Sequence, residues 1–188
     1  MKRIWIVLFA ALLLPQVSPA QVINFGKTLP VRSFSLTAAP VYNVDNVFHW
    51  EQAGMSYLVM AGYGFTYNLD MSAKYGYYNG ADYFGVDLQY LFRETRQSYY
   101  SLYGGVHKWD EYGVDATVTY TYTPQYWANL SIGLDLDVDI SVLELRAWVP
   151  LNFGINIDDR YFIYLEYNLP ATEEAWDILG GGVTFIFR

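Results

Sequence analysis

The chain has 188 residues, a formal net charge of −8, no cysteine, and 19% aromatic residues against 16% charged ones. This length suits one domain, and the negative charge argues against nucleic acid as a partner. The lack of cysteine excludes disulfides, thiolate chemistry and a lipid-modified N-terminal cysteine. The excess of aromatic over charged residues is typical of a surface that partly contacts lipid.

The first 20 residues have the features of a secretory signal peptide. Lys2 and Arg3 precede an apolar run over 4–14, and Ser18-Pro19-Ala20 forms a small-residue cleavage pattern. We expect cleavage after Ala20, which removes two cations and no acids and leaves 168 residues with a formal charge of −10. No later segment has about 18 uninterrupted apolar residues, so any membrane span must be made of strands.

The segment 21–54 gives a weak pattern. Residues 34–38 alternate as in a strand, but Pro40 and the long stretch 43–54 would make a poor periplasmic turn. If the chain forms a closed barrel, whose strand count is usually even, this region supplies two strands or none. We expect none, with a periplasmic extension or a partial plug as its role. The alternative is a barrel of ten strands.

The remainder, 55–188, divides into runs of strand-forming residues separated by turn residues. The predicted strands are 57–69, 83–92, 99–109, 114–123, 127–139, 142–157, 161–169 and 179–187. About eight strands is the smallest common size of an outer-membrane barrel. Aromatic residues near the strand ends, Tyr103 among them, are expected on the outward face.

The clearest strand pattern lies between residues 114 and 138. Apolar residues occupy every second position over 114–122 and again over 130–138, with Asp, Thr, Ser, Asn or Gly between them. Successive side chains of a strand point to opposite faces, so this is a hairpin with one apolar and one polar face. In an exported chain with no apolar helix, we expect the apolar face to meet lipid.

The end of the chain carries a family resemblance. The run Gly182-Val183-Thr184-Phe185-Ile186-Phe187 resembles the Gly-x-x-aromatic-x-aromatic signal with which bacterial outer-membrane barrels end. Over 57–187 the chain is similar to the small OmpA-type and OmpX-type barrels. The resemblance implies an all-β, antiparallel up-and-down transmembrane barrel in the outer membrane, a monomer surrounded by outer-membrane lipid. It also implies that Gly182, Phe185 and Phe187 are read by the barrel-insertion machinery.

Orientation follows from a periplasmic C-terminus, because such barrels keep their short turns in the periplasm. The connections 93–98, 124–126 and 158–160 are then periplasmic. The regions expected outside are 70–82, 110–113, 140–141 and 170–178.

Turn lengths predict which polar residues face each other inside the barrel. A three-residue turn at 124–126 sets Asp115 opposite Asp135, and a four-residue turn at 110–113 sets Lys108 opposite Asp115. Two carboxylates placed opposite each other repel, so we expect nearby cations to offset them.

A reversal at 140–141 extends this row by one strand. It sets Arg146 opposite Asp135 and Glu144 opposite Asp137. The expected interior charge network is therefore Lys108, Asp115, Asp135, Glu144 and Arg146.

A bound divalent cation is the alternative to this network, because Ca²⁺ and Mg²⁺ prefer oxygen ligands. The candidate ligands are Asp115, Asp135, Asp137 and Asp139. The last three have the spacing of part of a calcium loop, but they lie on a predicted strand and lack the glycine and terminal Glu of such a loop. No other cofactor is expected.

Catalysis has little support in the sequence. The two histidines, His49 and His107, belong to no recognisable Ser-His-acid arrangement, and the register above points His107 outward beside Ala116. There is no Gly-x-Ser-x-Gly, phosphate loop or His/Cys metal set. We expect a non-enzymatic barrel with a structural or surface-interaction role. The alternatives are a narrow channel and a lipid-modifying enzyme.

Overall fold

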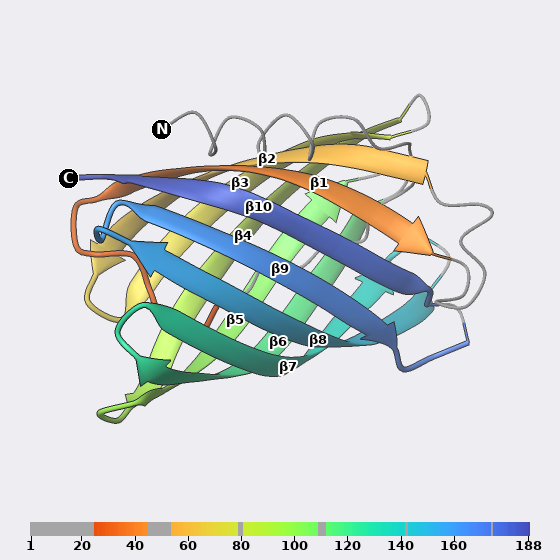
Figure 1. The fold of residues 1–188 in the computed structure, drawn as a ribbon. Coiled ribbons are helices and arrows are strands. Elements are labelled where there is room, and N and C mark those ends of the chain that lie inside the picture. The colour runs from red at the N-terminus through yellow and green to blue at the C-terminus, as the bar shows by residue number, and fades with distance from the viewer. Residues whose placement is uncertain (1–24, 45–53, 79–80, 109–111, 142, 174) are drawn as a thin grey trace.

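The computed structural model describes residues 25–44, 54–78, 81–108, 112–141, 143–173 and 175–188. Ten antiparallel strands close into a barrel in this part of the chain (Figure 1). They are β1 (Phe34–Val44), β2 (Gly54–Thr66), β3 (Leu69–Tyr78), β4 (Ala81–Glu94), β5 (Ser98–Lys108), β6 (Tyr112–Gln125), β7 (Ala128–Asp139), β8 (Glu144–Ile157), β9 (Tyr161–Pro170) and β10 (Asp177–Phe187). Within the described ranges, no helix is long and apolar enough to span a membrane.

Each strand pairs with its neighbours in the chain, and β1 pairs with β10 to close the barrel. In Figure 1 the first strand, in orange, runs beside the last strand, in blue. We call the end with the connections 67–68, 95–97, 126–127 and 158–160 the short-turn end. The opposite end, with 45–53, 79–80, 109–111, 140–143 and 171–176, is the loop end.

The expectation of eight strands was wrong, and the ten-stranded alternative describes the barrel. The two added strands are β1 and β3. Residues 70–82, expected as an outer loop, instead form β3, the next connection and the start of β4. The prediction had the strand at 57–69 begin in the periplasm and end in an outer loop. In the structure β2 instead ends at the two-residue turn 67–68 and pairs with β3, so it runs from the loop end to the short-turn end, opposite to the predicted direction.

Alternation along the strands separates an apolar exterior from a polar lumen. On β6, Thr117 and Thr119 are 2% and 1% exposed, whereas Val118 between them is 50% exposed. Ile132 on β7 is 48% exposed. A soluble barrel would bury these apolar side chains, so the arrangement fits a barrel surrounded by hydrocarbon.

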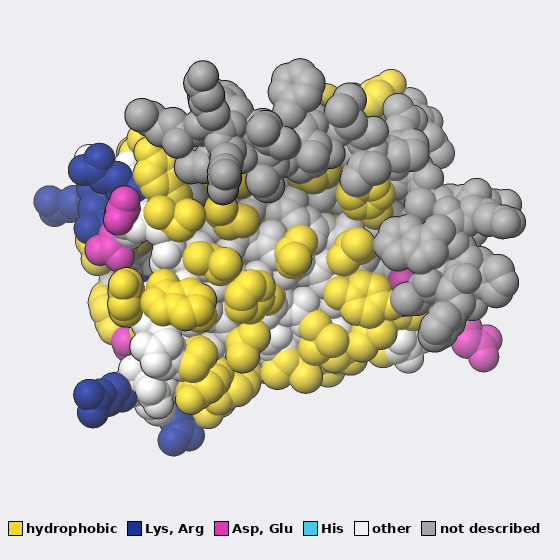
Figure 2. Space-filling view, viewed as in Figure 1, with side chains coloured by type: hydrophobic (Ala, Val, Ile, Leu, Met, Phe, Trp, Pro, Cys, Tyr) yellow, Lys and Arg dark blue, Asp and Glu magenta, His cyan; other side chains and the backbone are white. Residues whose placement is uncertain are grey.

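The surface in Figure 2 shows the same division. Hydrophobic side chains cover the side of the barrel, and lysine and arginine side chains gather at the end where β1 begins. That is the short-turn end. Its exposed basic residues are Lys27, Arg32, Arg93, Arg96, Arg160 and Arg188.

The last strand has the features expected of a C-terminal barrel strand. Phe185 and Phe187 are 39% and 57% exposed on the outward face, and the Phe185 ring meets the edge of Tyr161 with centroids 5.4 Å apart. Position 182 leaves no room for a side chain, because a Cβ there would lie 2.6 Å from the Ala38 carbonyl oxygen and 2.7 Å from the Tyr164 hydroxyl. Recognition of these residues by the insertion machinery stays a prediction.

Replacing Ile132 by arginine tests the lipid-facing assignment. A cation near the bilayer midplane is expected to destabilise the barrel by roughly 2–4 kcal/mol, measured by urea unfolding in lipid vesicles. The matched control is Leu145→Arg at the loop end of β8, which is equally exposed at 48%. Its cost should be about 0–1 kcal/mol, because charges near the interface are hydrated. Equal losses in the two variants would contradict the assignment.

Candidate functional site in the barrel lumen

Residues 25–33, which we call the internal segment, lie inside the barrel at its short-turn end. The chain reverses before β1 through Arg32, whose φ is 60°, and the Ser33 amide donates to the Pro30 carbonyl at 3.1 Å. The chain passes Gly64 so closely that a Cβ there would meet the carbonyl oxygens of the internal segment. Of the region expected as an extension or plug, residues 25–33 therefore occupy the lumen, whereas 34–44 form β1 in the wall.

Hydrogen bonds fix the internal segment to several strands. The Gly26 amide donates to Thr121 Oγ1 at 2.7 Å, and Ser101 Oγ donates to the Gly26 carbonyl at 2.6 Å. Gln89 Nε2 donates to the Phe25 carbonyl at 2.7 Å, and the Tyr103 hydroxyl donates to the same oxygen. Tyr103 was expected outside, but it is 7% exposed and faces the lumen.

The Asp70 carboxylate holds the middle of the internal segment. Asp70 Oδ2 accepts a hydrogen bond from the Leu29 amide at 2.7 Å, and Thr28 Oγ1 donates to the Tyr67 carbonyl at 2.7 Å. Backbone groups of an isolated segment lack strand partners and must find others when buried. These side chains of the wall supply them.

Large side chains fill the lumen beyond the internal segment. We call Ala39, Val41, Leu58, Tyr83, Trp148, Tyr164 and Ile178 the apolar cluster. The Phe25 ring packs on Phe162 and Tyr164, with centroids 4.4 and 5.9 Å away. Ten strands enclose a wider lumen than the eight whose own side chains suffice to fill it. The internal segment and these rings occupy the additional space.

A row of charged residues crosses the wall nearer the loop end. The register places Asp87, Gly105, Asp115, Asp137 and Arg146 opposite one another on successive strands β4 to β8. We call this the charged row. Gly105 leaves room for its neighbours, because a Cβ there would collide with the carboxylates of Asp87 and Asp115.

A lysine and a histidine side chain meet the carboxylates of the charged row. Lys74 Nζ lies 2.5 Å from Asp87 Oδ2, and both side chains are 4% exposed. His107 lies between Asp115 and Asp137, with Nδ1 and Nε2 each 3.5 Å from a carboxylate oxygen, and its ring stacks on Tyr83 at 5.8 Å.

The predicted pairs at the β6–β7 hairpin were two residues out of register. Asp115 faces Asp137, and Asp135 faces Thr117, whose hydroxyl donates to Asp135 Oδ1 at 2.5 Å. The turn consists of residues 126–127 and is preceded by an irregularity between Tyr122 and Gln125. A shift of two residues keeps the predicted faces but changes the partners.

Arg146 and Glu144 also have partners other than those predicted. Arg146 is opposite Asp137, and its Nε donates to Glu144 Oε1 at 2.8 Å. Asp135 is opposite Trp148, and Glu144 is opposite Asp139. Arg146 thus belongs to the interior network as predicted, but it forms an ion pair with Glu144 and lies opposite Asp137 instead of Asp135.

Lys108 lies on the outer face and was wrongly placed in the interior. It is opposite Tyr112, and its Nζ lies 5.9 Å from the centroid of that ring. The predicted pairing with Asp115 was three residues out of register, and an odd shift exchanges the two faces of a strand. The same error pointed His107 outward, whereas its side chain lies in the lumen.

No group of three or more His, Cys, Asp or Glu side chains in the described part of the chain is arranged to hold a metal ion. The four candidate ligands are divided among other contacts. Asp139 Oδ1 accepts from the Ser141 amide at 3.0 Å, outside the charged row. Asp115, Asp135 and Asp137 have the partners described above.

A double-mutant cycle tests the corrected pairing of Arg146. Arg146→Ala should destabilise the barrel by about 1–3 kcal/mol, because it leaves Asp137 with less positive charge nearby. Asp137→Asn should recover part of this loss, with a coupling of at least about 0.5 kcal/mol. Asp135→Asn is the matched control and should not rescue Arg146→Ala. Additive effects of Arg146→Ala and Asp137→Asn in urea titrations would contradict this electrostatic coupling.

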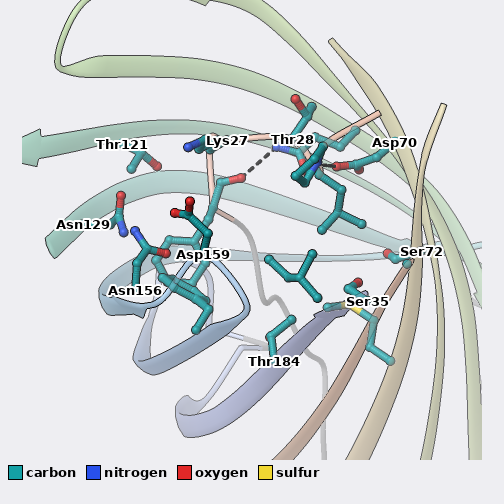
Figure 3. Close-up of a pocket in the computed structure, with 18 of the residues that line it drawn as sticks. Lys27, Thr28, Ser35, Asp70, Ser72, Thr121, Asn129, Asn156, Asp159 and Thr184 are labelled. Carbon is teal, nitrogen blue, oxygen red and sulfur yellow. Dashed lines mark hydrogen bonds between the residues drawn. The ribbon is translucent and has the colours of Figure 1, made fainter. Parts of the chain in front are cut away.

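A cavity of about 190 Å³ lies at the short-turn end, between the internal segment and the wall. Figure 3 shows Asn129, Asn156 and Asp159 on one side of it, and Ser35, Ser72 and Thr184 on the other. Sequence reasoning missed this cavity, because it exists only where the internal segment leaves the wall uncovered.

No family model matches the chain, and no curated protein matches it by sequence. Solved structures match it by fold. The COG4313 outer membrane channel from Pseudomonas putida F1 has a TM-score of 0.58 at 10% identity, over 92% of this chain and 100% of that one. The KdgM porin has a TM-score of 0.55 at 10% identity, over 81% and 99%. Its complex with disordered oligogalacturonate has 0.55 at 9% identity, over 83% and 99%.

At these identities the likeness concerns architecture alone. The finer resemblance to OmpA-type and OmpX-type barrels stays a prediction. The closed antiparallel barrel, its apolar exterior and these neighbours together show that the chain has the fold of the outer-membrane β-barrels.

Proposed function

We propose that this protein is a non-enzymatic channel of the outer membrane, narrow and selective against anions, which its own internal segment holds closed. The observation that carries this proposal is the charge of the lumen. The buried or half-buried carboxylates on the inner face of the described wall are Asp70, Asp87, Asp115, Asp135, Asp137, Glu144 and Glu166, against Lys74 and Arg146; Lys27, Asp159 and Arg188 lie exposed at the short-turn end. In a lumen with low-dielectric walls such an excess attracts cations and repels anions.

The architectural neighbours support a pore. One is an outer membrane channel and another a porin. The oligogalacturonate bound by the porin is not proposed as a solute here, because each galacturonate unit carries a carboxylate. Asp135 and Glu166, which are 3% and 1% exposed, would repel it. We propose small cationic or neutral solutes instead.

Orientation in the membrane follows the usual rule for such barrels, with the short-turn end in the periplasm. An N-terminal signal peptide would direct export, and surrounding lipid and the insertion machinery would be the partners of a monomer. Two residues named in the sequence analysis lie outside the described part of the chain: Ala20, where cleavage is expected, and His49.

Catalysis is not part of the proposal. Both ring nitrogens of His107 lie near carboxylates and its ring stacks on Tyr83, so neither nitrogen is directed at a nucleophile. A structural or surface-interaction role is the second candidate, favoured by the dense packing of Trp148 and Tyr164, which are 1% and 2% exposed.

A reversible lock on the internal segment tests the channel. The chain has no cysteine, so Gly26→Cys with Thr121→Cys would create its sole pair of thiols. A Cβ at position 26 would lie 3.2 Å from the Thr121 Cβ, close to the roughly 3.5–4.5 Å of a disulfide. In planar bilayers we expect no conductance from the oxidised variant and cation-selective steps after reduction.

Two further variants complete this test. A chain that begins at residue 34 should conduct without reduction, and Asp135→Asn with Glu166→Gln should lower the preference for cations. If the truncated barrel folds and stays silent, the protein has the structural role. If oxidation leaves an existing conductance unchanged, the internal segment is not the gate.

A further inference from the structure

The cavity at the short-turn end has the size of a small ring compound. Its volume of about 190 Å³ exceeds the roughly 150 Å³ that suffices for benzene in an engineered protein cavity. In Figure 3 polar side chains surround it, with Asp70 beside the internal segment and Asn129 and Asn156 on the wall.

Two amides present complementary groups to this cavity. Asn129 Oδ1 accepts a hydrogen bond from Thr123 Oγ1 at 2.8 Å, and Asn156 Nδ2 donates to the Tyr126 carbonyl at 3.2 Å. Within the described chain, Asn129 Nδ2 and Asn156 Oδ1 form no hydrogen bond, and neither atom is sealed from solvent. A donor and an acceptor on two neighbouring strands are therefore available at the cavity. A hydroxyl group can satisfy both kinds of partner.

Carboxylates of different elements face the same space. Asp70 uses Oδ2 to accept the Leu29 amide, and Asp159 is fixed by the left-handed turn at 158–159, where its φ is 51°. Both carboxylates accept hydrogen bonds from hydroxyls and repel an anion. Lys27 and Arg188 also line the cavity and oppose a cation.

Apolar groups complete the lining. The ring of Phe162 and the side chains of Met60 and Leu29 border the cavity. Binding sites commonly combine apolar contact with a few polar groups that fix orientation. A ring with C–H groups on its faces and hydroxyls on its edge matches both parts of this lining.

The geometry points to a binding site for one neutral polyhydroxylated ring, such as an uncharged monosaccharide unit, between the internal segment and the wall. The site would add a solute-binding step to the proposed channel. That role in solute passage rests on the proposed function. The ligand contacts both Asp70, which holds the internal segment, and the wall residues Asn129 and Asn156. Binding therefore bridges the segment and the barrel.

Equilibrium binding tests the site without any measurement of conductance. The mature chain is refolded in lipid vesicles, because glycosidic detergents would compete, and D-glucose is titrated by saturation-transfer difference NMR. We expect saturable binding of glucose. Galacturonate and lysine should bind at least about tenfold more weakly, which corresponds to about 1.4 kcal/mol.

Variants of the two amides localise the binding. Asn129→Leu removes the donor and should weaken glucose binding at least about tenfold, the effect of losing one or two hydrogen bonds. Asn156→Asp keeps an acceptor and should bind within a few-fold of the native chain. Asn68→Leu, in the turn at 67–68, is the matched control and should change nothing.

The outcomes separate this site from the channel. Absence of saturable glucose binding, unchanged binding in folded Asn129→Leu, or preference for galacturonate or lysine would each overturn the site. A barrel that conducts ions without binding glucose would lose the site and keep the proposed function. A barrel that binds glucose and never conducts, even when truncated, would lose the function and keep the site.

Discussion

Asp87→Ala is expected to destabilise the barrel by about 3–5 kcal/mol, because it leaves the buried ammonium of Lys74 without its carboxylate partner. The two charged atoms are 2.5 Å apart, and both side chains are 4% exposed. Removal of one member of such a pair costs more than the pair contributes, since the remaining charge keeps its desolvation penalty. Urea unfolding in lipid vesicles measures the loss.

A second substitution distinguishes a stranded charge from lost packing. Lys74→Met in the Asp87→Ala background removes the charge and retains most of the side-chain volume, so it should recover most of the loss. Lys108→Ala, on the outer face, is the matched control and should change stability by no more than about 0.5 kcal/mol. A loss below about 1 kcal/mol for Asp87→Ala would mean that water reaches Lys74.

Trp148→Ala is expected to destabilise the barrel by about 3–5 kcal/mol and, once the internal segment is released, to raise its conductance. Trp148 is 1% exposed, its indole N–H donates to the Trp176 carbonyl at 2.9 Å, and the two rings meet edge to face. Truncation empties part of the apolar cluster that fills the lumen. The space gained is a path for ions, provided that the internal segment is also released.

The control for this prediction is Trp127→Ala at the short-turn end. Trp127 is 44% exposed in the turn at 126–127 and is not part of the apolar cluster, so its loss leaves that cluster unchanged. Conductance should therefore stay at the native level. A conductance increase in Trp127→Ala, or none in the Trp148→Ala variant combined with the reduced cysteine pair, would contradict the role of the apolar cluster.

Strands with clear alternation could be predicted from the sequence, and those with a mixed outer face could not. The hairpin of β6 and β7 presents Val, Leu, Ile and Tyr outward and Thr, Ser and Asp inward. This pattern allows only one assignment of residues to the lipid and lumen faces. On β3 the inward residues include Asp70, Lys74 and Gly76, and the outward Ala73 adds little hydrophobic signal. The turn at 67–68 is too short to separate β3 from β2 by composition.

The interior network shows a second limit. Alternation assigns each residue to a face, but it does not say which residue lies opposite it on the next strand. That information lies in the turn, where one additional residue changes the register. Asp115 was correctly assigned to the lumen with the wrong partner, whereas Lys108 was assigned to the wrong face. Lys74 was missed because β3 was not recognised as a strand.

The internal segment could not be placed from sequence. Phe25, Gly26 and Leu29 carry no periodic pattern, and their partners are Gln89, Ser101, Thr121 and Asp70 on distant strands. Such contacts depend on the closed wall, which is a property of the whole barrel. The cavity beside the segment follows from the same arrangement and was equally hidden.

The junction of β1 with β10 has a consequence for the order of assembly. It joins the two strands farthest apart in the chain, so its closure carries the largest loop entropy and is expected to form last. The internal segment precedes β1 directly and must already lie within the curling sheet when that junction forms. Between the Ala38–Val183 and Val41–Gly180 pairs the ladder is interrupted at Pro40, which has no N–H to donate. The final seam therefore has a gap in its hydrogen bonds, as the β7–β8 pair has at Pro150, and we expect this last seam to be a weak point of a newly made barrel.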